Sequence, residues 1–578
     1  MSPEVRTPWY SHSEGVPLHL QYPDCSMFDL VRKSAEKNPD VVAYDFYGVK
    51  ATYQKFVGQV ETCAKALRAL GVEPGDRVTI CMPNAPQAVI MFYALNRMGA
   101  IANMVHPLSA QEEIAFYLNE SESVAVLTLG QFYPKFQAIR DKIHVKTMIV
   151  TGIEDALTGP VRAGYWLTQG RKIPAVPKDD PLVLFWKDFI KAGEVYTGEY
   201  ICPRYNNDTA AILYSGGTTG TTKGILLSNL NFNALGMQTG AAGCCITEGH
   251  KMLSIMPIFH GFGLGVCIHT MLIHSCTCIL VPQFTVDSYA QLLKKHRPNY
   301  IAGVPTLYEA LLRLKKAENL DLSQLEGIFS GGDSLSIELK HKVDAFLTAH
   351  GSKEQIREGY GTTECVTASC LTPRNSYKEG SIGIPFPDTY YKIVIPSTHD
   401  EVPYGTVGEI CIAGPSVMQG YMNQPKETAQ TLQLHDDGMV WLHTGDLGSM
   451  DEEGFIYFKQ RLKRMIITSG YNVYPSQVEN VIDAHEAVLM STVIGIKDDY
   501  KMQKVKAFVV LRPGYEPGEE MKQSILDHCR KHIAKYAMPR ELEFRDALPK
   551  TLVGKVAYTV LEREEAAKAE TEAESPVG

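Results

Sequence analysis

Helical and strand patterns alternate along the first quarter of the chain. A helical stretch over 27–37 precedes the apolar run 41–44, and helical spacing over 53–70 precedes a strand pattern over 77–82. Further segments of the same alternation fall at 87–98, 101–105, 110–118, 124–127, 132–143 and 147–150. Helices between short strands connect parallel strands and cover their sheet. The sequence therefore predicts an α/β fold, with parallel-type sheets flanked by helices.

A glycine- and threonine-rich segment joins two apolar runs near the middle of the chain. The runs span 210–214 and 225–227, and the segment from 215 to 224 reads S-G-G-T-T-G-T-T-K-G. Glycines let a ligand approach the backbone, while hydroxyls and a lysine donate hydrogen bonds to phosphate oxygens. The pattern predicts a strand, a polyphosphate-binding loop and a second strand, with a plain surface hairpin as the alternative. The candidate phosphate-binding residues are Ser215, Gly216, Gly217, Thr218, Thr219, Gly220 and Lys223.

Size, charge and cysteine usage set limits on the class of protein. The 578 residues exceed a single core, so two to four structural units are expected. A net charge of −9 without any basic run argues against a nucleic-acid binder. The 13 cysteines form no C-x-x-C pair, which favours buried reduced thiols in a cytoplasmic protein.

No segment has the composition of a membrane anchor. The first fifteen residues are polar, unlike a signal peptide, and histidines and glycines interrupt the most apolar block, 253–281. We expect a buried helix and strand in that block. A helix over 229–245 and a strand over 252–256 should precede the apolar stretch 261–281.

The later chain changes character at several points. Residues 152–198 lack periodicity and predict a loop-rich connection, and 357–364 predicts a strand running into a glycine turn at a sheet edge that binds ligand. The predicted domains are 1–460, with a β-rich subdomain over about 386–460, and a small α+β domain over 461–561. The Ala/Glu-rich tail 562–578 lacks an apolar face, so we expect it to be disordered.

Several motifs occur in the same order as in one enzyme superfamily. The mid-chain loop resembles the pattern [ST]-[SG]-G-T-T-G-x-P-K-G, with Gly216 for the commoner Ser and Thr222 for Pro. The other matching segments are 256–263, 330–334, 359–364, 443–447, 461–464 with 470–475, and 549–555. Together they resemble the acyl-adenylate-forming superfamily, which includes acyl-CoA synthetases, firefly luciferase and peptide-synthetase adenylation domains.

The resemblance implies roles around one ATP. Lys555 and Thr219 would act on the reacting phosphate oxygens, and Glu364 with Thr219 would hold Mg²⁺. Asp446 and Arg461 would bind the ribose hydroxyls, with a turn and a surface ion pair as the alternatives. The residues assigned to the adenine pocket and its edge are Gly332, Asp333, Gly359, Tyr360, Gly361 and Thr362. The alternative for Tyr360 is a core tyrosine, and the alternative for Asp333 is a plain glycine-rich turn.

Two further roles concern the acid and the thiol. His260 would border the acyl site, and the glycines 261 and 263 would leave space for a roomy pocket. The small domain would rotate about Lys463 between the half-reactions, after which the segment containing Gly470 and Tyr471 lines the route of the thiol. Arg464 departs from the acidic neighbour usual beside this hinge lysine.

The sequence predicts an ATP-dependent acyl-CoA synthetase that uses ATP, Mg²⁺ and CoA. Its segments 259–281 and 303–312 resemble those of the medium- and long-chain fatty acyl members. Aromatic-acid CoA ligases and luciferase-like oxidation are the alternatives within the superfamily, and a non-catalytic nucleotide-binding protein is the alternative outside it. The expected partners are a carboxylic acid and CoA. Peripheral contact with a membrane and homodimer formation are left open, as is the preferred acid.

Overall fold

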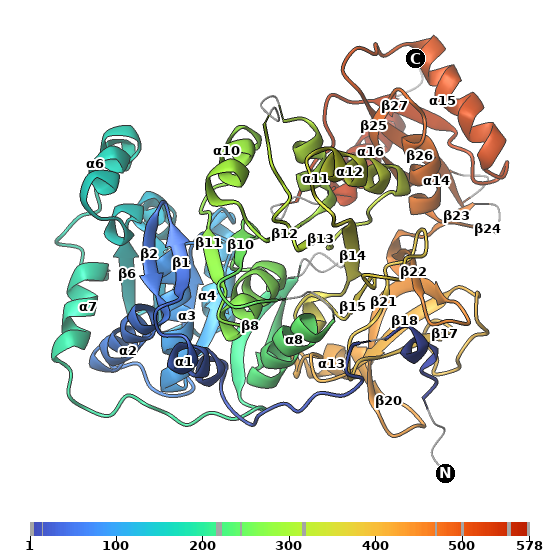
Figure 1. Ribbon diagram of the computed structural model, residues 1–578. Helices are drawn as coiled ribbons and strands as arrows, with labels where there is room; N and C mark the ends of the chain where they lie inside the picture. Colours follow the sequence, from blue (N-terminus) through green and yellow to red (C-terminus); the bar gives the residue numbers. More distant parts are fainter. Residues whose placement is uncertain are drawn as a thin grey trace.

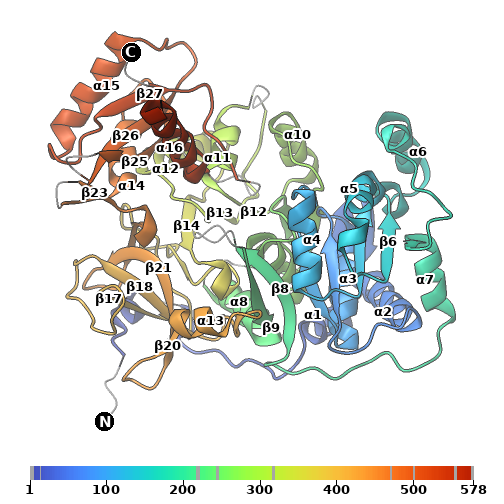
Figure 2. The same cartoon turned by 180° about the vertical axis from the view of Figure 1, so that it is seen from behind.

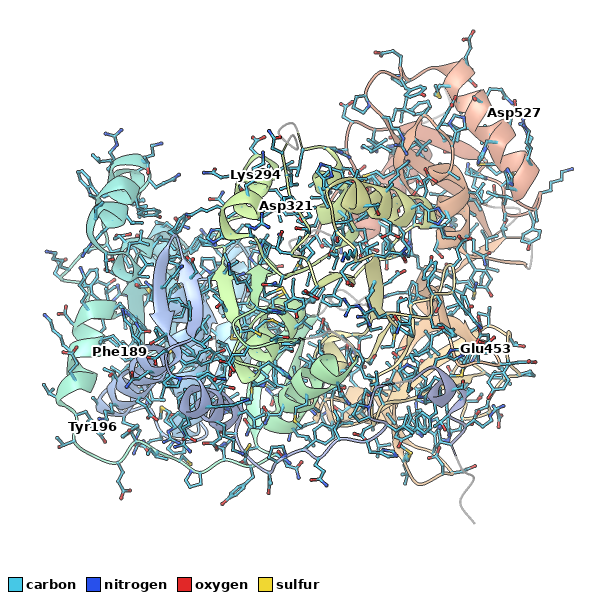
Figure 3. All side chains as sticks on the ribbon, viewed as in Figure 1. Phe189, Tyr196, Lys294, Asp321, Glu453 and Asp527 are labelled. Carbon is cyan, nitrogen blue, oxygen red and sulfur yellow. The ribbon has the colours of Figure 1, made fainter. Side chains whose placement is uncertain are left out.

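The computed structural model describes residues 5–13, 15–215, 222–242, 246–314, 319–468, 471–498, 502–551 and 556–574 (Figure 1). Two large sheets and a smaller β-rich sheet make up the first 461 residues, and a fourth sheet belongs to a small domain that follows. Charged side chains such as Asp321, Glu453 and Asp527 lie at the outside (Figure 3).

The first large sheet has the strand order β19-β9-β8-β4-β3-β5-β6-β7. Its strands are β3 (Arg77–Cys81), β4 (Ile101–Met104), β5 (Ala125–Leu129), β6 (Thr147–Thr151), β7 (Val183–Phe185), β8 (Thr209–Ser215), β9 (Lys223–Ser228) and β19 (Gly420–Tyr421). Strands β3 to β8 pair in parallel, whereas β9 pairs antiparallel with both β8 and β19. The two strands predicted at 210–214 and 225–227 are confirmed, and residues 216–221 between them lie outside the described residues.

The second large sheet has the order β16-β15-β14-β13-β12-β10-β11-β1-β2. Its strands are β1 (Val42–Phe46), β2 (Val49–Thr52), β10 (Lys251–Ser254), β11 (Thr277–Leu280), β12 (Tyr300–Gly303), β13 (Gly327–Ser330), β14 (Ile356–Tyr360), β15 (Cys370–Leu371) and β16 (Ile384–Pro385). The five strands from β14 to β11 along this order are parallel neighbours. The carboxyl ends of these strands therefore meet at one edge.

Helices cover both sheets and share two hydrophobic cores with them, the second of which lies under α10, α11 and α12. They are α1 (Met27–Lys37), α2 (Tyr53–Ala69), α3 (Pro86–Met98), α4 (Gln111–Glu120), α5 (Tyr133–Ala138), α7 (Trp186–Val195), α8 (Asn229–Ala241), α9 (Met271–Ile273), α10 (Val286–His296), α11 (Pro305–Leu312) and α12 (Ile337–Ala349). The predicted buried helix in 261–281 is a π-helix over Phe262–Thr270, every residue of which is buried. None of the described helices combines the length and apolarity needed to span a bilayer.

A β-rich subdomain and a small domain follow the two large sheets along the chain. The first comprises β17 (Tyr390–Val394), β18 (Gly408–Ala413), β20 (Leu432–Leu434), β21 (Val440–Met450) and β22 (Ile456–Arg461), with α13 (Pro425–Thr431) beside them. The second comprises β23 (Ile466–Thr468), β24 (Tyr471–Val473), β25 (Val488–Asp498), β26 (Met502–Leu511), β27 (Glu541–Phe544), α14 (Pro475–Asp483), α15 (Glu519–His532) and α16 (Tyr558–Glu574). The small domain has a core of its own and lies at one corner of the molecule (Figures 1 and 2).

The expectation of a loop-rich connection over 152–198 was wrong. This stretch contains α6 (Gly159–Thr168), β7 and α7. Helix α7 packs against α2 so closely that a Cβ on Gly193 would lie 2.2 Å from the carbonyl oxygen of Thr62. A glycine at the closest contact weakens the apolar periodicity, which is why the helix was missed.

The tail is also more ordered than expected. Helix α16 runs from Tyr558 to Glu574, so it crosses the boundary placed at 561. Leu561 is fully buried, and the next turn is tied to the small domain by the ion pair between Lys506 Nζ and Glu565 at 2.6 Å. Tertiary ion pairs and Ala/Glu helix propensity replace the apolar face that the sequence lacks.

Candidate active site

Three parallel strands end side by side at the edge where the predicted nucleotide motifs begin. Gly303 of β12 pairs with Ser330 of β13, and Ser330 pairs with Glu358 of β14. The loop after β13 is held at this edge because the Gly331 N–H donates to the Gly303 carbonyl at 3.1 Å. The structure thus brings together Gly332, Asp333, Gly359, Tyr360, Gly361 and Thr362, as open α/β sheets do at their ligand crevices.

The candidate ribose-binding residues and the candidate adenine-binding Tyr360 meet at one carboxylate. The Tyr360 hydroxyl donates to Asp446 Oδ2 at 2.6 Å, and Arg461 Nε lies 3.3 Å from Asp446 Oδ1. Asp446 is only 3% exposed, and its charge raises the pKa of the Arg461 guanidinium. An oriented carboxylate beside a half-exposed guanidinium suits a pair of vicinal hydroxyls, which both donate and accept hydrogen bonds.

A tight turn in β21 presents Asp446. Gly445 adopts φ +69°, a conformation that favours glycine, and its N–H donates to Glu409 Oε1 at 3.0 Å. The Asp446 N–H donates to Thr444 Oγ1 at 3.1 Å, and that hydroxyl donates to the Ile410 carbonyl at 2.7 Å. Two neighbouring residues of β18, Glu409 and Ile410, therefore fix the turn.

Two side chains that the sequence analysis missed hold the phosphate-loop lysine and the candidate metal ligand. Lys223 forms an ion pair with Glu427 of α13 and lies 4.7 Å over the ring of Tyr421. The Tyr421 hydroxyl in turn donates to Glu364 Oε1 at 2.9 Å. Lys223 and Glu364 therefore share a neighbour, which places both at the mouth of the strand–loop–strand unit. Their partners lie on β19 and α13, too far along the chain for any local pattern to find.

His260 follows β10, but the space predicted beside it is absent. A Cβ on Gly261 would lie 1.6 Å from the Val366 carbonyl oxygen, and one on Gly263 would lie 2.1 Å from that of Pro257. These glycines allow backbone segments to touch, so the expected reason for them was wrong. The His260 Nδ1 accepts from the Phe262 N–H at 3.2 Å, which orients the ring at the start of the π-helix.

The hollow at this site lies deeper, between α8, the π-helix and strands β13 to β15. It is a partly open pocket with a cavity volume of about 40 Å³, and its lining is mostly apolar. The lining includes Phe262, Val266, Phe329, Leu371 and Phe386, together with Gly331, Gly332 and Gly359 of the nucleotide segments. An apolar cavity and the nucleotide edge therefore share walls.

Comparison with known proteins agrees with this arrangement. A family model described as "AMP-binding enzyme" matches residues 31–422, and another described as "AMP-binding enzyme C-terminal domain" matches 477–555. The chain belongs to the AMP-binding enzyme family. The superfamily and enzyme class predicted from the motifs, an AMP-forming acyl-CoA synthetase, are confirmed.

Relatives of this AMP-binding enzyme span nearly its whole length. It is 35% identical over 570 residues to a long-chain-fatty-acid–CoA ligase of Bacillus subtilis, which covers 97% of this chain and 99% of the relative. A ligase of the same description from Escherichia coli is 32% identical, over 95% and 96% of the two chains. Among solved structures, ATP-bound MatB from Rhodopseudomonas palustris has a TM-score of 0.80 at 26% identity, covering 93% and 99%. The anthranilate CoA ligase AuaEII in complex with anthranoyl-AMP has a TM-score of 0.83 at 24% identity, covering 96% of this chain and 99% of that one. At this identity the likeness shows the fold alone.

The segment predicted to act as the hinge contains one departure from the motif, Arg464. Lys463 lies in a short 3-10 turn, Leu462–Arg464, between β22 and β23. Arg464 forms an ion pair with Glu479 of α14 and donates to Thr492 Oγ1 at 3.0 Å. The basic residue beside the predicted hinge lysine is thus paired with an acidic residue of the small domain.

Part of the predicted site lies outside the described residues. These positions are Gly216, Gly217, Thr218, Thr219, Gly220, Gly470 and Lys555. For Tyr471 only the backbone is described, in β24, where it pairs with Thr468. The roles assigned to all of them, and to Lys463, stay predictions.

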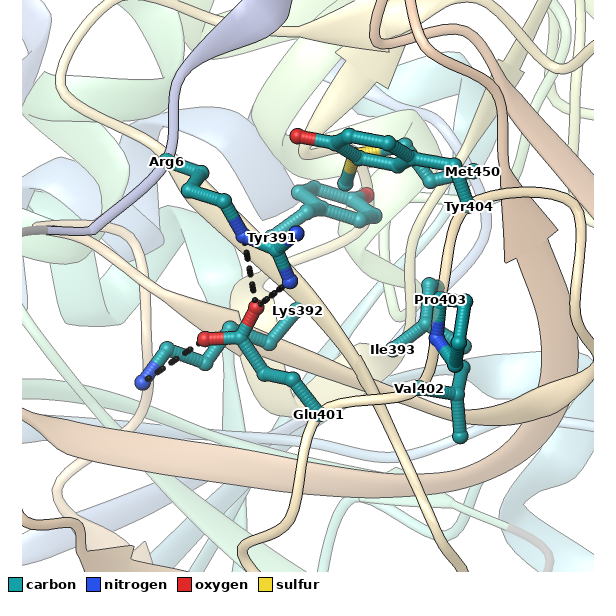
Figure 4. A pocket seen from close by; sticks show the side chains of 9 residues that line it. All are labelled: Arg6, Tyr391, Lys392, Ile393, Glu401, Val402, Pro403, Tyr404 and Met450. Atoms are coloured by element: carbon teal, nitrogen blue, oxygen red, sulfur yellow. Dashed lines mark hydrogen bonds and ion pairs between the residues drawn. The ribbon is translucent and has the colours of Figure 1, made fainter.

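A second hollow lies on the β-rich subdomain, away from the nucleotide edge (Figure 4). Its charged lining is already paired, because Glu401 contacts both Arg6 and Lys392. Tyr391, Tyr404 and Met450 fill its apolar side. Paired charges in a shallow hollow leave no obvious group to recognise a nucleotide.

Proposed function

We propose that this AMP-binding enzyme activates a medium- or long-chain fatty acid with ATP and transfers the acyl group to CoA. The acid oxygen bonds to the α-phosphorus while the bond to the β-phosphate oxygen breaks, which yields acyl-AMP and pyrophosphate. The CoA sulfur then bonds to the acyl carbon, AMP departs with the electron pair, and the thiol proton is released.

The observation that carries the proposal is the wall shared by the apolar cavity and the nucleotide edge. Gly359 lines the cavity, and the next residue, Tyr360, donates a hydrogen bond to Asp446. An alkyl chain in the cavity would therefore direct its carboxylate toward the nucleotide. Burial of such a chain contributes roughly 0.8 kcal/mol per methylene.

The donor set at Glu364 fits Mg²⁺. The carboxylate is oriented by Tyr421 through one oxygen, and a hard oxygen donor close to bound phosphates is what Mg²⁺ prefers. When bound, the ion would supply neutralisation of phosphate charge. Glu364 would hold it, and Thr219 is the second proposed ligand.

Fatty acids are favoured over aromatic acids by two observations. The cavity lining is largely aliphatic and aromatic carbon, and the relatives of highest similarity named above are described as long-chain-fatty-acid–CoA ligases. The test is acid-dependent pyrophosphate release with CoA, measured over a panel from acetate to palmitate with benzoate and coumarate. Preference for acids of about eight carbons or more supports the proposal, whereas preference for the aromatic acids overturns it.

We also infer a peripheral contact between helix α6 and an anionic membrane surface. The helix has no buried residue, and Trp166 and Leu167 are each 55% exposed. Residues 158–178 carry four basic side chains, Arg162, Arg171, Lys172 and Lys178, and no acidic one, in a chain of net charge −9. The helix projects from an outer corner in both views (Figures 1 and 2). Exposed tryptophan flanked by cations suits the interfacial zone of a bilayer.

The free cysteines bear on where the protein acts, and its assembly state is left to experiment. The eleven cysteines among the described residues all carry free thiols, which supports the cytoplasm as the place of action. Homodimer formation stays a prediction, and size-exclusion chromatography with light scattering tests it.

A further inference from the structure

Three histidines come together in the β-rich subdomain, apart from the groups that the proposed reaction uses. His435 follows β20, His443 lies in β21, and His399 lies between β17 and β18. One ring nitrogen of each lies within 4.8 Å of the others. His435 and His443 are 4% and 8% exposed, whereas His399 is exposed.

A carboxylate fixes the tautomer of His443. Its Nδ1 lies 3.1 Å from Glu409 Oε2, and a carboxylate accepts, so Nδ1 carries the hydrogen. The lone pair is then on Nε2, which faces His435 Nε2 at 3.0 Å. A histidine that donates one N–H to a carboxylate and points its other nitrogen inward has the arrangement of a zinc ligand.

The two buried imidazoles are already spaced for one ion. Two nitrogens bound to a tetrahedral Zn²⁺ at about 2.0–2.1 Å lie roughly 3.4 Å apart. The observed 3.0 Å needs to open by only a few tenths of an ångström. Replacing the shared proton by a metal ion would satisfy both Nε2 atoms at once.

His399 supplies the third ligand from the solvent side. Its ring stacks on His435 with centroids 4.0 Å apart and planes at 17°, and its Nε2 lies 2.9 Å from Gln433 Oε1. Stacked rings cannot both point in-plane lone pairs at one ion, so His399 must turn about its side-chain torsions. Its exposure permits this rotation at the loss of one surface hydrogen bond.

The surrounding charge is close to balanced. Lys392 lies on the neighbouring strand β17 and forms ion pairs with Asp437 and Glu401, the second of which is drawn in Figure 4. Glu409 adds a negative charge behind His443, while Cys411 Sγ lies 3.5 Å from the His443 Nδ1. The positive charge of a divalent ion is therefore not opposed by an unpaired lysine.

We propose that His399, His435 and His443 bind one divalent transition-metal ion of the zinc class, with Glu409 orienting His443. Three imidazoles favour zinc, copper or nickel over Mg²⁺ or Ca²⁺, which select oxygen donors. The site is distinct from the Mg²⁺ position proposed at Glu364. Because Glu409 also holds the Gly445 N–H, the ion would brace the turn that presents Asp446.

The test uses full-length protein without a histidine tag, stripped with EDTA and dialysed. Titration with Co²⁺ is followed by its visible absorption, and displacement by Zn²⁺ confirms a shared site. We expect one equivalent per chain, and binding weakened at least about tenfold in His399→Ala and His435→Gln. His341→Ala, which removes another exposed histidine, is the matched control and should bind as the parent does.

The exposed His399 keeps the test independent of folding, since its replacement removes one ligand without opening the core. Zn²⁺ should also raise the thermal midpoint of the parent protein and of His341→Ala, and leave that of His399→Ala unchanged. The proposal is overturned if no Co²⁺ binds at about 100 μM, or if His399→Ala and His435→Gln both bind as tightly as the control.

Discussion

The Tyr360 hydroxyl and the Asp446 carboxylate are 2.6 Å apart although 86 residues separate them in the chain. The contact joins the second large sheet to the β-rich subdomain, and Arg461 completes it from β22. Two layers of the molecule thus build a single carboxylate-centred site, where we propose that the ribose of ATP binds.

Replacing Tyr360 by Phe should raise the KM for ATP about tenfold or more with a smaller change in kcat. The variant removes a hydrogen bond to a charged group, a contact of about 1.5–3 kcal/mol. Steady-state kinetics with varied ATP measure it. Tyr457→Phe is the control, because that hydroxyl also donates to a carboxylate, Asp451, at 3.1 Å but outside the site. Equal effects of the two variants would contradict the assignment.

Replacing Gly261 by Ala should lower stability by about 2 kcal/mol or more, since the added Cβ would meet the Val366 carbonyl oxygen. Thermal unfolding measures the loss. Gly58→Ala, in the middle of α2 with nothing within 4 Å of the new Cβ, should leave stability equal or higher. A Gly261→Ala variant that is as stable as the parent protein, and whose preference for larger acyl groups is unchanged, would argue against the close backbone packing.

Glu358 should make stability depend on pH. Desolvation raises its pKa from 4.5 to about 8, so between these values the folded protein holds a proton that the unfolded chain releases. The free energy of unfolding therefore falls as pH rises through this window, by up to about 5 kcal/mol. Glu358→Gln, which stays neutral, should flatten the profile of thermal midpoint against pH. The exposed control Glu516→Gln should not, and an identical profile for both variants would refute the role of Glu358.

Replacing Trp166 and Leu167 by Ser should reduce binding to anionic vesicles at least about fivefold while leaving acyl-CoA synthesis from soluble acids intact. Both side chains are more than half exposed, so their loss should not unfold the protein. Cosedimentation with vesicles containing phosphatidylserine measures binding, with phosphatidylcholine vesicles for comparison. Thr168→Ala, on the same helix, is the control. Unaltered binding of the double variant would exclude α6 as the contact.

Local patterns predicted the parts of the structure that local forces decide. The strands β8 and β9 and the edge residues 359–362 followed from apolar runs ending in glycine turns. Helix α7 was missed because Gly193 interrupts its apolar face for close packing on α2. Glu427 and Tyr421 could not be foreseen beside Lys223, because their proximity depends on how β19 and α13 return to the first sheet.

The most direct test concerns Lys555, which lies outside the described residues. Acid-dependent exchange between ATP and pyrophosphate is measured for Lys555→Ala, beside thioester formation from supplied acyl-AMP and CoA. The account predicts at least about a hundredfold loss of exchange with thioester formation retained, and no effect of Lys535→Ala. Equal loss of both half-reactions, or exchange that survives, would contradict it.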